Sequence, residues 1–123
     1  MDNIRQDVLV VDDEPELREA LQDLLEFEGY GVQCAQDGAE ALDHINKGVK
    51  PRLIILDLMM PRMNGYEFMA ELERRDLRRG IPILVLTADS SARARATHIG
   101  ADVGIAKPFD ATVLLEEVAR LMR

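Results

Sequence analysis

Three short, uninterrupted apolar segments constrain the fold of this chain more than any other feature. They are Val8-Leu9-Val10-Val11, Ile54-Ile55-Leu56 and Ile83-Leu84-Val85-Leu86. Each is rich in β-branched residues and shows no polar alternation, which indicates a strand buried on both faces of a parallel sheet. Two weaker segments, from Tyr30 to Ala35 and from Val103 to Ala106, are predicted to be strands as well.

Amphipathic segments separate the apolar runs and are predicted to be helices. The first starts at Pro15 and stops at Gly29, and the second runs from about Ala39 to Lys47. The third begins at the Asn64 cap, the fourth runs from about Ala92 to Ile99, and the fifth begins at the Asp110 cap. Five strand–helix units predict an α/β fold with one doubly wound parallel sheet and helices on both faces. In such sheets ligands bind at the carboxyl ends of the strands.

Composition limits the classes of protein to which the chain can belong. Its 123 residues fit one domain, 1–123. The net charge of −8 argues against direct binding to nucleic acid. The segment from Met1 to Asp7 is polar, no apolar stretch is long enough to span a membrane, and Cys34 is the single cysteine. We therefore expect a cytoplasmic protein without disulfides.

Polar residues stand where the predicted strands stop. Asp12-Asp13, Asp57, Thr87 and Lys107-Pro108 follow four different strands, so their side chains are expected to converge at one edge of the sheet. Each residue alone also has an ordinary structural interpretation as a helix cap, a strand end or a solvated lysine. Together they predict a site for Mg²⁺, which prefers carboxylate oxygens, and for an aspartyl nucleophile in phosphoryl transfer.

Four motifs resemble those of the receiver domains of two-component response regulators. They are Val10 to Pro15, Leu56 to Gly65, Leu86 to Ala88 and Ala106 to Phe109. The motifs occur in the expected order, and the resemblance covers essentially the whole chain. It implies a flavodoxin-like fold, similar to chemotaxis regulators, with strand order 2-1-3-4-5.

The resemblance also implies a role for each residue at the strand ends. Asp57 would accept the phosphoryl group, Asp13 would bind Mg²⁺ directly, and Asp12 would hold the metal largely through water. The backbone carbonyl of Met59 would complete the protein ligands together with Asp57. Lys107 and Thr87 would contact the phosphoryl oxygens, and the Lys107–Pro108 peptide bond would be cis.

The implied partners are proteins. A sensor histidine kinase or phosphotransfer protein would donate the phosphoryl group from phosphohistidine. The surface of the fourth helix, fifth strand and fifth helix would then change and contact an unknown downstream protein. The chain would be a monomer or a weak, phosphorylation-dependent dimer. It would promote its own phosphorylation and dephosphorylation without turning over a separate substrate.

Three positions modify this interpretation. The family usually carries an aromatic switch residue three positions before the lysine, and this chain has Gly104 there. Either the change is neutral, or the chain lacks the aromatic half of the switch, which we favour. Met59 and Asp89 occupy the positions that tune the lifetime of the phosphoryl group in the family, but the sequence does not fix the sign of their effect. We also expect the alanine-rich helix from about Ala92 to be weakly packed.

Two other functions compete with a phosphorylated signalling module. A degenerate receiver would act only as a protein-binding module, although none of the residues needed for phosphorylation is lost here. A phosphohydrolase of the haloacid dehalogenase type would also use an aspartyl nucleophile. That family requires an acid two residues after the nucleophile, where this chain has Met59.

Overall fold

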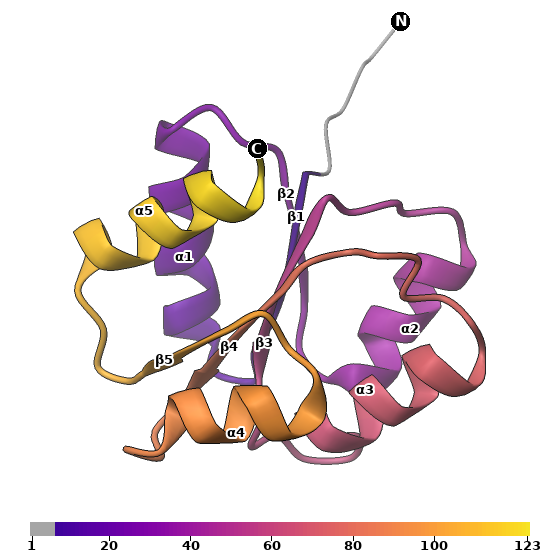
Figure 1. Ribbon diagram of the computed structural model, residues 1–123. Coiled ribbons are helices and arrows are strands. Elements are labelled where there is room, and N and C mark those ends of the chain that lie inside the picture. Colours follow the sequence, from indigo (N-terminus) through magenta and orange to yellow (C-terminus); the bar gives the residue numbers. More distant parts are fainter. Residues whose placement is uncertain (1–6) are drawn as a thin grey trace, which may run out of the picture.

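The computed structural model describes residues 7–123, which form one layer of parallel strands between two layers of helices (Figure 1). The strands are β1 (Val8–Val11), β2 (Val32–Ala35), β3 (Leu53–Asp57), β4 (Ile83–Thr87) and β5 (Val103–Ala106). The helices are α1 (Pro15–Phe27), α2 (Gly38–Asn46), α3 (Gly65–Arg74), α4 (Ala92–Ile99) and α5 (Ala111–Leu121). The strand order is β2-β1-β3-β4-β5, which confirms the predicted topology.

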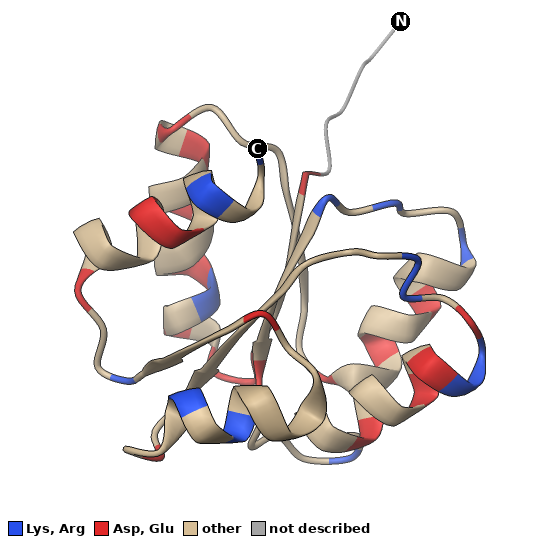
Figure 2. Cartoon of the chain, in the orientation of Figure 1, with Lys and Arg blue, Asp and Glu red and all other residues tan. Residues whose placement is uncertain are grey.

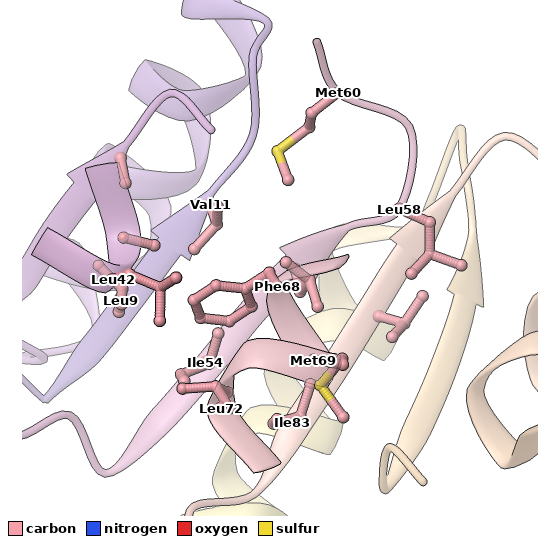
Figure 3. Packing of buried hydrophobic residues seen from close by; sticks show 14 of the residues in the cluster. Leu9, Val11, Leu42, Ile54, Leu58, Met60, Phe68, Met69, Leu72 and Ile83 are labelled. Atoms are coloured by element: carbon pink, nitrogen blue, oxygen red, sulfur yellow. The ribbon is translucent and has the colours of Figure 1, made fainter. Parts of the chain in front are cut away.

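Alternate side chains of each central strand contribute to two separate cores. Leu9 and Val11 point into the core beneath α2, α3 and α4, whereas Val8 and Val10 point into the core beneath α1 and α5. Phe68 of α3 is fully buried in the first core, against the face of the sheet that carries Leu9 and Val11 (Figure 3). Burial on both faces explains why the β1, β3 and β4 segments are continuously apolar.

Local signals set the helix boundaries close to the predicted ones. Asn64 and Glu67 form the predicted capping box, with the Asn64 side chain accepting from Glu67 N–H and the Glu67 side chain from Asn64 N–H. Pro15 occupies the first turn of α1, and the Asp110 carboxylate caps α5. The structure differs from the prediction by one residue at each end of α2 and by a β2 strand that starts at Val32.

Within residues 7–123, none of the helices combines the length and the apolar character needed to cross a bilayer. The prediction for the N-terminal segment from Met1 concerns residues 1–6, which lie outside the described part of the chain.

Candidate metal and phosphoryl-acceptor site

The carboxyl ends of β1 and β3 bring three carboxylates together. Val11 of β1 pairs with Leu56 of β3, so the residues that follow each of them emerge side by side. Carboxylate oxygens of Asp12, Asp13 and Asp57 all lie within 4.8 Å of one another. Asp12 and Asp57 are nearly inaccessible, with 1% and 4% of their surface exposed, whereas Asp13 is half-buried. The predicted convergence of these three residues is confirmed.

The Asp57 carboxylate is held in an environment that opposes its charge. Burial and the neighbouring Asp12 carboxylate raise the pKa of Asp57 from 3.8 to about 6. The Met59 N–H, which donates to Asp57 Oδ1 at 3.2 Å, and the Lys107 ammonium act in the opposite direction. In this unfavourable environment, the Asp57 carboxylate is suited to having its charge neutralised by a metal ion or by formation of a covalent bond.

Lys107 reaches into the same cluster from the end of β5. Its Nζ donates to Asp12 Oδ2 and Glu14 Oε1 at 3.0 Å each, and lies 3.4 Å from Asp57 Oδ2. Burial lowers the pKa of Lys107, but the hydrogen bonds and charges of these carboxylates outweigh it, so the pKa is raised. Lys107 is therefore held as a positive charge among these three acids.

Thr87 ends β4 beside β5, where it pairs with Ala106. Its side chain is buried, its Oγ1 accepts from the Asp89 N–H at 3.3 Å, and its carbonyl accepts from the Lys107 N–H at 2.7 Å. The Lys107–Pro108 bond is cis, as the resemblance implied. Thr87 thus connects the ends of β4 and β5 to the loop that leads into α4.

The β3–α3 loop, residues 58–64, leaves Asp57 and turns directly into α3. The Gly65 N–H donates to Leu58 O at 3.1 Å, and a Cβ on Gly65 would lie 2.6 Å from the carbonyl oxygen of Asp57. Only glycine allows the first turn of α3 to approach the Asp57 backbone this closely. Met59 therefore sits in a tight connection, with its N–H on Asp57 and its side chain 68% exposed.

Asp89, the second predicted tuning residue, turns toward its own loop and helix. Its Oδ1 accepts from the Ser91 N–H at 2.7 Å and its Oδ2 from Arg95 Nε at 3.1 Å. The Ser91 N–H and the Arg95 side chain lower the pKa of Asp89. Asp89 anchors the start of α4, a contact that the sequence did not predict.

Gly104 has a packing role that sequence reasoning missed. A Cβ at this position would lie 2.2 Å from Ala92 O and 2.9 Å from Ala96 Cβ, so the backbone of α4 rests directly on β5. Of the residues of α4, all of which are described, Ala92 and Ala96 are buried. The helix was expected to be weakly packed; its buried side chains are indeed small, but its backbone lies closer to β5 than expected, and glycine is required for this contact.

Two further residues around Asp12 were not predicted as site residues. Glu14 binds Lys107, and its own N–H donates to Asp12 Oδ1 at 2.9 Å. Arg18 donates from Nη1 to Asp12 O at 2.8 Å. The acidic run after β1 placed Glu14 near the site, but only the fold shows that Lys107 reaches it.

The donors at this site fit a hard divalent cation. The three clustered carboxylates supply oxygen ligands only, which suits Mg²⁺, and their charges exceed that of Lys107. The carboxylates of Asp12, Asp13 and Asp57 could hold such an ion, and the carbonyl of Met59, two residues after Asp57, is a candidate fourth ligand.

Comparisons with known proteins agree with this geometry. Residues 8–119 match the family model of the response regulator receiver domain. Response regulator MprA from Mycobacterium sp. (strain KMS) is 44% identical over 118 residues, which cover 94% of this chain and 50% of that protein. The chain thus spans about half the length of the curated relatives it matches.

Solved structures show the same fold. Chemotaxis protein CheY4 of Vibrio cholerae superposes with a TM-score of 0.84 at 33% identity, covering 95% of this chain and 98% of that one. Response regulator protein TrrA of Thermotoga maritima, in complex with Mg²⁺-BeF, gives 0.82 at 37% identity, covering 94% and 98%. The chain belongs to the response regulator receiver domain family.

Proposed function

We propose that the chain is a phosphorylation-activated signalling module in which Asp57 accepts a phosphoryl group in the presence of Mg²⁺. One observation carries this proposal: the buried Asp57 carboxylate lies within 4.8 Å of two other carboxylates and 3.4 Å from Lys107. A buried acid with a raised pKa beside a lysine is poorly explained by stability alone. It is well explained by phosphoryl transfer, which depends on positioning and charge neutralisation.

The reaction follows from the groups present. A carboxylate oxygen of Asp57 attacks the phosphorus of a phosphohistidine presented by a histidine kinase or phosphotransfer protein. The P–O bond forms, the P–N bond breaks, and its electron pair returns to the imidazole nitrogen. Lys107 exchanges its contacts with Asp12 and Glu14 for a phosphoryl oxygen. The product is an aspartyl phosphate, which water later hydrolyses.

Asp12, Asp13, Asp57 and the carbonyl of Met59 would hold the metal ion, Asp12 largely through water. When bound, Mg²⁺ would offset the negative charge of the carboxylates and of the transferring group. The raised pKa of Asp57 supports this assignment, because burial and the Asp12 carboxylate both disfavour the charge on Asp57, and a bound cation would offset them. The complex of the related TrrA with Mg²⁺-BeF supports it too.

Thr87 would transmit the change. Its hydroxyl accepts from the Asp89 N–H and has a hydrogen of its own to donate to a phosphoryl oxygen. Movement of Thr87 toward Asp57 would pull on Asp89, and Asp89 holds Arg95 of α4. The signal would then emerge on the surface of α4, β5 and α5, where Figure 2 shows basic residues along α4.

The donor would approach over the groove beside Lys107. The groove has a volume of about 640 Å³ and is lined by α1, the start of the β4–α4 loop and the start of the β5–α5 loop; its apolar residues are Leu17, Ala20, Ala88, Pro108 and Phe109. We propose a cytoplasmic module, 1–123, that is monomeric or weakly dimeric, has no substrate of its own to turn over, and acts on a downstream protein without direct nucleic-acid contact.

The convergence of all the required residues argues against a degenerate receiver. A dehalogenase-type phosphohydrolase is disfavoured by the family match and by Met59, which supplies no acid. The direct experiment treats the protein with Mg²⁺ and acetyl phosphate and measures its intact mass. Wild type should gain one phosphoryl group and Asp57→Asn should gain none, while Asp23→Asn on the exposed surface of α1 should behave as wild type. A mass gain that persists in Asp57→Asn contradicts the proposal.

A further inference from the structure

The β3–α3 loop is attached to the first turn of α2, a helix that contributes no residue to the carboxylate cluster. Arg62 donates from Nε to Asp37 Oδ2 at 2.7 Å, and its Nη2 lies 2.6 Å from the same oxygen. Next to this pair, the Gly38 N–H donates to Met63 O at 2.9 Å. Two adjacent residues of the loop are therefore fixed to the N-cap residue and the first residue of α2.

Asp37 is well placed to act as the fixed end of this connection. It is buried, and its Oδ1 caps α2 by accepting from the Glu40 N–H at 2.8 Å, which leaves Oδ2 for Arg62. Burial raises the pKa of Asp37, but the backbone N–H groups and the Arg62 guanidinium outweigh it, so the pKa is lowered and the group stays ionised. A Cβ on Gly38 would lie 2.8 Å from Met63 Cγ, so the contact between loop and helix is close-packed.

The loop end of the connection carries backbone strain. Arg62 has φ +62°, a left-handed conformation that is unfavourable for a residue other than glycine. Met59 lies three residues before Arg62, and its orientation depends on the path of this short loop between Asp57 and Gly65. A strained residue held by a charged contact fixes the path of the loop.

We propose that Asp37 and Arg62 are positioning residues for the metal site, holding the β3–α3 loop so that the Met59 carbonyl faces the carboxylates. The inference rests on the proposed Mg²⁺ site. It makes the start of α2 part of that site, although none of the three clustered carboxylates comes from α2. Loss of the contact should weaken Mg²⁺ binding while leaving the chemistry at saturating Mg²⁺ intact.

The test is a double-mutant cycle of Asp37→Asn, Arg62→Gln and their combination. Asparagine can still cap α2, so Asp37→Asn removes the charge without removing the cap. Arg78→Gln is the matched control, because Arg78 also bridges two loops. It donates to Asp102 Oδ2 at 2.9 Å and to Gly100 O, at the end of the sheet opposite the carboxylates. Mg²⁺ binding is measured by titration calorimetry, and the rate of phosphorylation by acetyl phosphate is measured as a function of Mg²⁺ concentration.

We expect each single variant to bind Mg²⁺ about 10-fold more weakly, the double variant to be no weaker than either, and Arg78→Gln to match wild type. The phosphorylation rate of the variants should recover at saturating Mg²⁺. If wild type binds Mg²⁺ and the two single variants bind it equally well, the positioning role is wrong while the proposed function stands. If wild type binds no Mg²⁺, the proposed metal site fails and this inference fails with it.

Discussion

The loops after β3 and β4 leave the same edge of the sheet from neighbouring strands, but they are held in different ways. The β3–α3 loop is attached to another element, since Arg62 binds Asp37 and Met63 binds Gly38 of α2. In the β4–α4 loop, Asp89 binds Ser91 of the same loop and Arg95 of its own helix, and Arg95 in turn contacts Tyr66 of α3. One loop is fixed by the rest of the fold, and the other is fixed mainly by itself.

The helices that follow the two loops differ in the same way. Helix α3 buries Phe68, Met69 and Leu72, and each such side chain contributes about 2 kcal/mol on burial. Helix α4 buries Ala92 and Ala96, which contribute far less apolar area. A phosphoryl group on Asp57, as proposed, would lie between the two loops, so the α4 side, which buries less apolar area, is the one expected to move.

The largest expected effect compares alanine at the two glycines on which α3 and α4 rest. Gly65→Ala places a Cβ 2.6 Å from the Asp57 carbonyl at the end of β3, and should lower the free energy of unfolding by about 3 kcal/mol. Gly104→Ala creates a closer contact, 2.2 Å, but α4 buries only small side chains and is expected to move away from β5, so the loss should be about 1 kcal/mol. Urea denaturation measures both.

Amide hydrogen exchange shows which helix accounts for the stability lost in each variant. In Gly104→Ala the amides of α4 should lose protection while those of α3 keep it. A larger loss of global stability in Gly104→Ala than in Gly65→Ala would show that α4 is as firmly held as α3, and the distinction between the two sides would be wrong.

The next-largest effect concerns the negative charge of Asp57, at the end of β3 between the α3 side and the α4 side. Without Mg²⁺, Asp57→Asn should raise the free energy of unfolding at pH 7.5 by about 2 kcal/mol, because the buried carboxylate with a pKa of about 6 is removed. Thermal or urea denaturation in the presence of a chelator measures the difference. Asp23→Asn on α1 is the control for the substitution itself and should change little.

The pH dependence of this difference has a definite sign. Between pH 3.8 and about 6 folded wild type binds more protons at Asp57 than the unfolded chain, so its stability falls as pH rises through this window. The advantage of Asp57→Asn should therefore be full above pH 6 and should disappear toward pH 4. An advantage that is constant with pH would mean that the Asp57 charge does not cause it.

The smallest effect is expected at Arg95. Arg95→Gln removes the contact to Asp89 on the exposed surface, so the melting temperature should stay close to that of wild type. Amide exchange in residues 89–95 should become faster, because this contact is part of what holds the β4–α4 loop. Unchanged amide exchange in these residues would show that Arg95 is not part of the connection between Thr87 and α4.

The fold was predictable because its signals are local. Continuous apolar runs give the buried strands, and the Pro15, Asn64 and Asp110 signals give the helix starts within about a residue. The edge strand β2 was predicted too long at its start: the Tyr30 N–H donates to Leu25 O of α1, and the residues that pair with β1 begin at Val32. The approach of the strand-end acids to Lys107 followed from parallel topology alone.

The contacts that were missed join residues far apart in the chain. Arg62 and Asp37 are 25 positions apart, and Lys107 and Glu14 are 93 apart. Ordinary spacing rules do not relate such residues. Gly104 was interpreted from the aromatic side chain that it lacks. Its packing role depends instead on the path of α4, which the sequence does not specify.

The most direct test measures amide hydrogen exchange in the presence of Mg²⁺, with and without beryllofluoride as a phosphoryl mimic. Mg²⁺ is present in both samples, so the effect of the metal on the β3–α3 loop cancels. Changes in protection should be concentrated in residues 88–100, with residues 58–64 nearly unchanged and a weaker response in β5. Changes centred on Val103–Ala106 or on the β3–α3 loop, with α4 unaffected, would contradict a signal carried by Thr87, Asp89 and α4.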